Sequence, residues 1–87
     1  MNKSITIPDK QLIYKLIEYR NGYYQGITLD GTPQGLGLFF DDHSILYSAI
    51  WKEGVPSGRA AVFFSREQYI YGDWKAGKPN GFNVFRS

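Results

Sequence analysis

The sequence predicts an all-β protein, a single-layer antiparallel meander of β-hairpin repeats with about seven strands. The motif Gly-x-Pro-x-Gly occurs three times, at residues 31–35, 54–58 and 77–81, in constant steps of 23 residues. Beside each motif, large apolar and small residues occupy alternate positions, which is the period of a β-strand. The aromatic share of 17% is high for 87 residues, and large rings suit a thin fold with little core volume.

Each copy of the repeat has an aromatic, a small and an aromatic residue at alternate positions before the motif. After the motif, a small residue and then an apolar residue follow. The equivalent sets are Tyr24, Tyr47 and Ile70; Gly26, Ala49 and Gly72; Thr28, Trp51 and Trp74; Gly37, Ala60 and Asn83; and Phe39, Val62 and Phe85. We expect the small residues to leave room for neighbouring rings against the backbone. We expect the proline to fix φ inside the connection, and the flanking glycines to take positive φ where the chain reverses. Each copy is therefore predicted to be a β-hairpin.

The period divides the chain into four segments. An N-terminal segment at 1–23 contains a degenerate repeat strand, repeat 1 covers 24–46, repeat 2 covers 47–69, and a truncated repeat 3 covers 70–87. No copy can bury its apolar face alone, so the copies are expected to stack as one domain.

The stretch from Leu12 to Gly22 fits two structures. Leu12, Tyr14 and Leu16 alternate as in a strand, and Arg20-Asn21-Gly22 resembles a turn. A short N-terminal helix beginning near Pro8 and Asp9 is the alternative, because apolar residues also recur at helical spacing. The strand is favoured because it continues the repeat.

The repeat residues resemble the MORN (membrane occupation and recognition nexus) repeat family, whose unit reads roughly Tyr-x-Gly-x-Trp-x-x-Gly-x-x-x-Gly-x-Gly over about 23 residues. The first copy matches at Tyr24, Gly26, Gly31, Gly35 and Gly37, and the third at Gly72, Trp74, Gly77 and Gly81, with Tyr71 one place late. Ala49, Ala60 and Asn83 depart from the pattern. The resemblance implies an elongated, twisted sheet that serves as a scaffold. It also implies protein partners bound along an aromatic-lined groove, with membrane or phosphoinositide association proposed for some members.

Six aromatic residues are the candidate partner-binding residues. Tyr24, Tyr47, Trp51 and Trp74 are expected on one face of the sheet, and Phe40 and Phe63 on the other. The rings of the first face could simply pack against one another. However, a single-layer sheet has no second layer to cover both faces, and an exposed aromatic patch is typical of a partner site.

Composition argues against most other functions. The chain has no cysteine, His43 is the only base for a Ser-His arrangement, and no serine lies in a nucleophile-elbow motif, so we predict neither enzyme activity nor a cofactor. The cluster Asp41-Asp42-His43 is interpreted as a solvated turn rather than a metal site. A net charge of +2 is too small to indicate a nucleic-acid partner. The absence of cysteine, of a signal segment and of a long apolar run predicts an intracellular protein that is cytoplasmic or associated with the cytoskeleton or a membrane.

The predicted function is therefore a non-catalytic protein–protein interaction scaffold or a small structural subunit, in a large assembly or in self-association. The alternative is a peripheral membrane module that binds anionic lipid through Lys75, Lys78, Arg86 and the N-terminal lysines.

Overall fold

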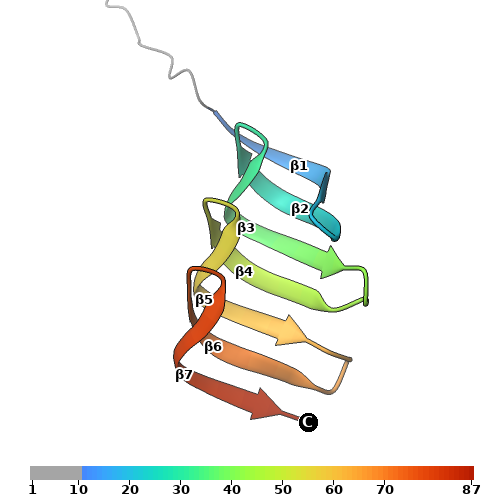
Figure 1. The fold of residues 1–87 in the computed structure, drawn as a ribbon, viewed down its shortest axis with the longest axis vertical. Helices are drawn as coiled ribbons and strands as arrows, with labels where there is room; N and C mark the ends of the chain where they lie inside the picture. Colours follow the sequence, from blue (N-terminus) through green and yellow to red (C-terminus); the bar gives the residue numbers. More distant parts are fainter. Residues whose placement is uncertain (1–10) are drawn as a thin grey trace, which may run out of the picture.

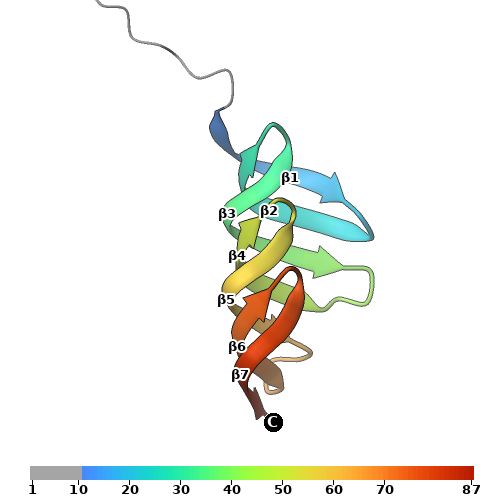
Figure 2. The same cartoon turned by 60° about the vertical axis from the view of Figure 1, so that its left-hand side comes forward.

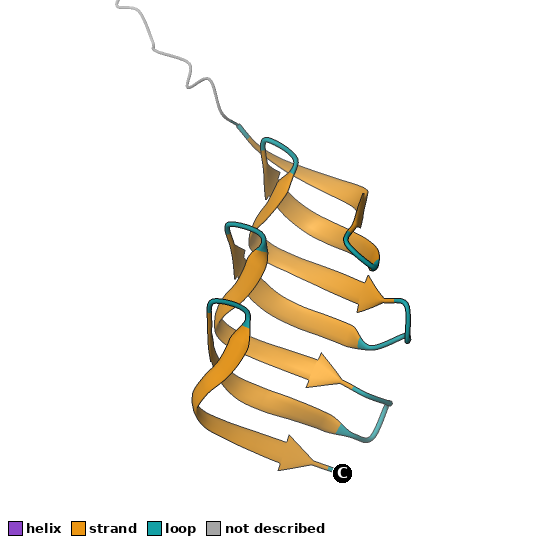
Figure 3. Ribbon diagram, viewed as in Figure 1, coloured by secondary structure: helices purple, strands orange, loops and turns teal. Residues whose placement is uncertain are grey.

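The computed structural model describes residues 11–87. The secondary-structure elements of this part are all β-strands (Figures 1 and 3). The strands are β1 (Leu12–Tyr19), β2 (Gly22–Leu29), β3 (Thr32–Asp41), β4 (Leu46–Lys52), β5 (Val55–Phe63), β6 (Tyr69–Lys75) and β7 (Lys78–Arg86). They lie in one antiparallel sheet in the order β1-β2-β3-β4-β5-β6-β7. The predicted all-β meander is thus confirmed.

The N-terminal stretch is a strand where the structure describes it. Leu12–Tyr19 forms β1 and pairs along its whole length with β2. The helix alternative is therefore wrong for Leu12 to Tyr19, while Pro8 and Asp9 lie outside the described residues. No helix within residues 11–87 is long and apolar enough to cross a membrane.

The hairpins turn on two residues each. Asp30 and Gly31, Glu53 and Gly54, and Ala76 and Gly77 all have positive φ, between 52° and 89°. Positive φ at both central residues is the geometry of a type I′ turn, whose twist matches that of the flanking strands. Only the first glycine of each Gly-x-Pro-x-Gly motif therefore belongs to the reversal.

The rest of the motif lies within strands, which corrects the expectation that the proline sits inside the connection. Pro33 pairs with Thr28, and Pro56 and Pro79 pair with Trp51 and Trp74. The last glycine, such as Gly35 at φ 106°, falls where the register shifts by a β-bulge. Bulges bend a strand and increase its twist. The motif therefore specifies a turn and, four residues later, a bend.

The bends fold the hairpin tips over one face of the sheet, as the curled ends in Figure 2 show. The second and third tips each reach the preceding hairpin, because the Gly54 amide donates to the Pro33 carbonyl at 3.0 Å and the Gly77 amide donates to the Pro56 carbonyl at 2.9 Å. The hydroxyl of Tyr19 in β1 also donates to the carbonyl of Gly54. The folded hairpin tips thus cover part of one face of the sheet.

A small aromatic core lies under these tips. Tyr24 and Trp51 have 0% and 4% of their surfaces exposed, and their ring centroids are 5.3 Å apart with the rings nearly perpendicular. Phe39 is also buried and packs against both Trp51 and Tyr47. The Trp51 indole donates to the carbonyl of Gly37 at 3.0 Å, so its polar group is satisfied.

Small residues make this packing possible. Gly26, Gly37, Ala49, Ala60 and Gly72 lie opposite one another across five successive strands. A Cβ atom at Gly37 would collide with the ring of Tyr24. The close approach of ring to backbone that the sequence predicts is therefore present in the first hairpin.

Candidate partner-binding face

The sheet has two unequal faces. The inner face is the one that the hairpin tips fold over, and it carries the core rings of Tyr24, Phe39 and Trp51. The outer face is the opposite one, formed by the alternate residues of every strand. No second layer of residues 11–87 covers the outer face.

The six predicted partner-binding residues divide between these faces. Tyr24 and Trp51 are core residues that have no surface to offer a partner, and Tyr47 and Trp74 are half-buried beside them. Phe40 and Phe63 point outward, and Phe40 remains 46% exposed. The burial of Tyr24 and Trp51 agrees with the alternative that the inner rings pack against one another. Tyr47, Trp74, Phe40 and Phe63 remain candidates for partner binding.

Two rows of outward side chains cross all seven strands, because each strand pairs in register with the next. The base row consists of Glu18, Tyr23, Phe40, Leu46, Phe63, Tyr69 and Arg86. The middle row consists of Leu16, Gln25, Leu38, Ser48, Ala61, Tyr71 and Val84. Most members are apolar or aromatic, and several large ones are substantially exposed. Together the rows form a broad apolar surface with few charges.

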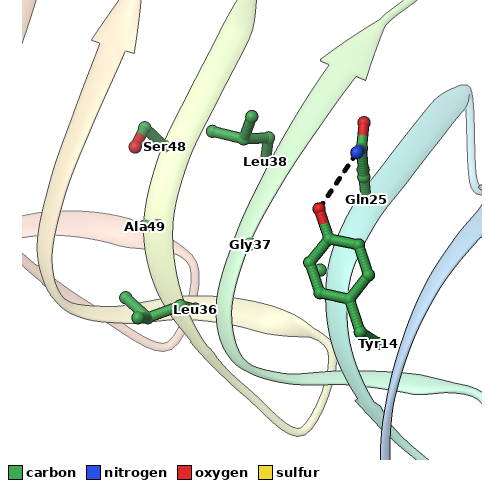
Figure 4. Close-up of a pocket in the computed structure, with 8 residues that line it drawn as sticks. Tyr14, Gln25, Leu36, Gly37, Leu38, Ser48 and Ala49 are labelled. Atoms are coloured by element: carbon green, nitrogen blue, oxygen red, sulfur yellow. Dashed lines mark hydrogen bonds between the residues drawn. The ribbon is translucent and has the colours of Figure 1, made fainter.

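The first hollow of the outer face has a volume of about 240 Å³ and lies over β2, β3 and β4 (Figure 4). Its floor includes the small residues Gly37 and Ala49, and Leu38 stands at its wall. On the β1 side, the amide of Gln25 donates to the hydroxyl of Tyr14 at 2.9 Å. The hollow therefore lies between outward side chains, over the backbone of the row whose small residues admit the inner rings on the opposite face.

The second hollow, of about 330 Å³, lies over β5, β6 and β7. Its aromatic walls include Phe63 and Tyr69, whose rings stack with centroids 5.5 Å apart and an interplanar angle of 12°. Tyr71 and Arg86 complete the rim. This hollow combines apolar walls with one cation. It therefore suits a partner segment in which an apolar side chain lies next to a polar or acidic one.

Charges on the outer face are sparse and ordered. Arg59 donates to the Asp73 carboxylate at 2.9 Å and to the Tyr71 hydroxyl at 2.9 Å, and these contacts, first with Tyr71 and then with Asp73, raise the pKa of Arg59. Glu18 and Arg86 stand at opposite ends of the base row. Within residues 11–87, neither Glu18 nor Arg86 forms an ion pair.

The basic residues of the lipid alternative do not converge. Lys75 and Lys78 face each other across the tip of the last hairpin, whereas Arg86 lies at the other end of β7. A membrane-binding basic patch needs several cations on one surface. Of the N-terminal lysines, Lys3 and Lys10 lie outside the described residues, and Lys15 lies in β1, at the opposite end of the sheet from β7. Among the described cations of this alternative, only Lys75 and Lys78 lie together.

The cluster at Asp41–His43 has a structural role. The Asp41 carboxylate accepts backbone N–H bonds from His43 at 2.9 Å and from Ile45 at 3.0 Å, and so closes the β3–β4 connection. The described part of the chain contains no group of three or more His, Cys, Asp or Glu residues that could hold a metal ion.

Sequence reasoning placed Phe40 and Phe63 on the outer face but missed other members of its two rows. Tyr23, Leu46 and Tyr69 pair with these two residues across neighbouring strands and could have been found from the same alternation of side chains. Tyr19 was missed for a different reason: the positions 23 and 46 residues later are Asp42 and Ser65, so the repeat gives no signal there.

Comparisons with known proteins add no further identification. The chain matches no protein-family model, and no curated protein matches it either. The geometry of the outer face is therefore the main ground for assigning a function.

Proposed function

We propose that this protein is a non-catalytic MORN-type scaffold that docks a protein partner on its outer face. The observation that carries the proposal is the pair of exposed apolar rows that cross the whole sheet. Monomeric soluble proteins rarely expose contiguous apolar surface of such extent unless it is an interaction site.

The difference between the two faces supports this proposal. The inner rings of Tyr24, Phe39 and Trp51 are buried in the core, so they stabilise the scaffold and do not contact a partner. On the outer face, Phe40 and Tyr71 are each 46% exposed. Tyr71 lines the second hollow, and Phe40 lies two residues along β3 from Leu38, which lines the first. Exposed rings beside apolar depressions are the usual anchors of protein interfaces.

A role as a small structural subunit of a larger assembly uses the same surface and is included in the proposal. Binding of anionic lipid is less well supported, because Lys75 and Lys78 are separated from Arg86 by the length of β7. Co-sedimentation with anionic vesicles at low salt distinguishes the two: the protein-scaffold proposal expects the chain to stay in the supernatant.

Affinity purification from the native source tests the proposal with a matched pair of variants. Phe40→Ser removes an outer-face ring, whereas Phe64→Ser removes a ring of similar exposure, 42%, outside both rows. Proteins recovered with the wild type and Phe64→Ser, but lost with Phe40→Ser, would support outer-face docking. Equal recovery by all three folded chains would contradict it.

A further inference from the structure

We propose that the partner on the outer face is a second copy of this chain, seated face to face about a two-fold axis that runs along β4. This inference rests on the proposed function, because it uses the same surface, and it adds the identity of the occupant. The order of residues in the two rows carries it, since each row is complementary to its own reverse.

An odd number of strands puts one strand at the centre of the sheet, and here that strand is β4. A two-fold axis along β4 lays β1 of one copy over β7 of the other, β2 over β6 and β3 over β5. Two sheets that pack in this way keep their strands roughly aligned, as in a β-sandwich. The interface is isologous, so every contact occurs twice except those on the axis.

The base row becomes chemically matched under this rotation. Glu18 of each copy faces Arg86 of the other, which gives two ion pairs at the rim from charges that have no such partner within residues 11–87 of one copy. Between them, Phe40 faces Phe63, and Leu46 faces its own symmetry mate. A row with an acid at one end, a base at the other and rings between is complementary to itself only when reversed.

The middle row matches in size and polarity. Gln25 faces Tyr71, so polar groups meet polar groups, and Ser48 faces its symmetry mate on the axis. Leu38 faces Ala61, a large residue over a small one. Alternation of large and small residues across facing layers is what lets two sheets interdigitate.

Each hollow also lies opposite side chains of the second copy. The first hollow is lined by Gln25 and Leu38, and the rotation brings Tyr71 of the second copy over it. The second hollow is lined by Ala61 and Phe63, and Leu38 and Phe40 of the second copy come over it. The rotation lays the first hollow, over β2, β3 and β4, on β6, β5 and β4 of the second copy, so the two hollows overlap in part, at β5 and β6.

The size of the face fits a weak, reversible dimer. Seven strands spaced about 4.8 Å apart, with about six residues each at about 3.3 Å, give roughly 30 by 20 Å. That is about 600 Å² from each copy and about 1,200 Å² in total, at the lower limit of standard specific interfaces. A dissociation constant in the micromolar range is expected.

Sedimentation equilibrium of the full chain, from about 1 µM to about 1 mM, tests the inference directly. The apparent mass should rise from the monomer value of 10.0 kDa towards twice that value. A mass that stays at the monomer value throughout would overturn the dimer while leaving the proposed function standing, because the latter is tested by capture of other proteins.

Charge reversal identifies the interface. Glu18→Arg or Arg86→Glu alone places like charges opposite each other at two points of the dimer, and should weaken association about tenfold. The two reversals combined restore opposite charges and should recover most of the loss. Failure of the double variant to recover would contradict the face-to-face arrangement.

Glu18 and Arg86 also lie on the edge strands, so a second pair of variants separates face packing from edge pairing. Leu38→Glu introduces a charge at the centre of the outer face, far from both edges, and should abolish the dimer. Gln68→Glu adds the same charge in the exposed β5–β6 connection and should leave the dimer unchanged. Circular dichroism of each variant checks that the sheet is retained, and a folded Leu38→Glu chain that still dimerises would overturn the inference.

Discussion

The hydroxyl of Tyr19 donates a 2.8 Å hydrogen bond to the carbonyl oxygen of Gly54, 35 residues further along the chain. Tyr19 also makes edge-to-face contacts with Tyr24 and Phe39. One side chain therefore joins the first strand, the aromatic core and the tip of the second hairpin, although it lies outside the repeat pattern.

Tyr19→Phe should lower the free energy of unfolding by about 1 kcal/mol, because the ring contacts remain and only the hydrogen bond to Gly54 is lost. Urea denaturation followed by circular dichroism measures the change. Tyr23→Phe is the matched control, since the exposed Tyr23 makes no side-chain hydrogen bond within residues 11–87, and it should have little effect. Equal losses in the two variants would show that the Tyr19 hydrogen bond contributes nothing.

Gly54→Ala and Gly31→Ala should differ although both replace a turn glycine with positive φ. At Gly31 a Cβ atom meets nothing within 4 Å, so only backbone strain of about 1 kcal/mol is expected. At Gly54 the Cβ atom collides with the Tyr19 hydroxyl, which adds about 1–3 kcal/mol. In a double-mutant cycle, Tyr19→Phe should remove part of the extra cost, whereas additive losses would contradict the contact.

Gly37→Ala should destabilise the protein by about 1–3 kcal/mol, because its Cβ atom collides with the buried ring of Tyr24. Ala60→Gly makes the reverse change in the same cross-strand row and should cost about 1 kcal/mol through backbone entropy. Thermal unfolding measures both changes. A Gly37→Ala chain as stable as the wild type would mean that Tyr24 does not lie over this glycine.

Tyr24 should ionise well above the ordinary pKa of a tyrosine. Burial, and to a lesser extent the charge of Tyr14, raises the pKa of Tyr24 to about 12. The folded-state pKa of Tyr24 lies above the ordinary value of 10.0. The contribution of neutral Tyr24 to the free energy of unfolding is therefore fully present below about pH 10 and is lost as the pH rises through about 12. Absorbance at alkaline pH follows the phenolates. Tyr24→Phe should remove the component of the titration at about pH 12, whereas Tyr23→Phe should leave it.

The two tryptophans should differ sharply on replacement by alanine. Trp51 is buried against Tyr24 and Phe39 and donates a hydrogen bond to Gly37, so Trp51→Ala should cost about 3–5 kcal/mol. Trp74 is only half-buried, and its indole N–H has no hydrogen-bond partner within residues 11–87. Trp74→Ala should cost about 1–2 kcal/mol. Denaturant titrations that gave equal losses would contradict the placement of Trp51 in the core.

The sequence predicts the strands and their order because the period of 23 residues and the alternation of side chains are both local signals. It does not predict the bend, because Pro33 and Gly35 fit a turn as well as they fit a bulged strand. Without the bend, nothing indicates which face the tips cover. For that reason Tyr24 and Phe40 look like equal candidates for a partner surface, although one is core and the other exposed.

The overlap of each hairpin tip with the hairpin before it also shapes how the chain acquires its structure. The Gly54 amide bonds to Pro33 and the Gly77 amide bonds to Pro56, while every strand pairs with its neighbour in sequence. The contact of Gly54 with Tyr19 spans only the hairpin of β2 and β3 that lies between them. No long loop has to close before a contact forms, so assembly can begin at any hairpin and spread stepwise in both directions. Opening follows the same steps in reverse, so strands at either end exchange their amide hydrogens first and the amides of β3 and β4 exchange last.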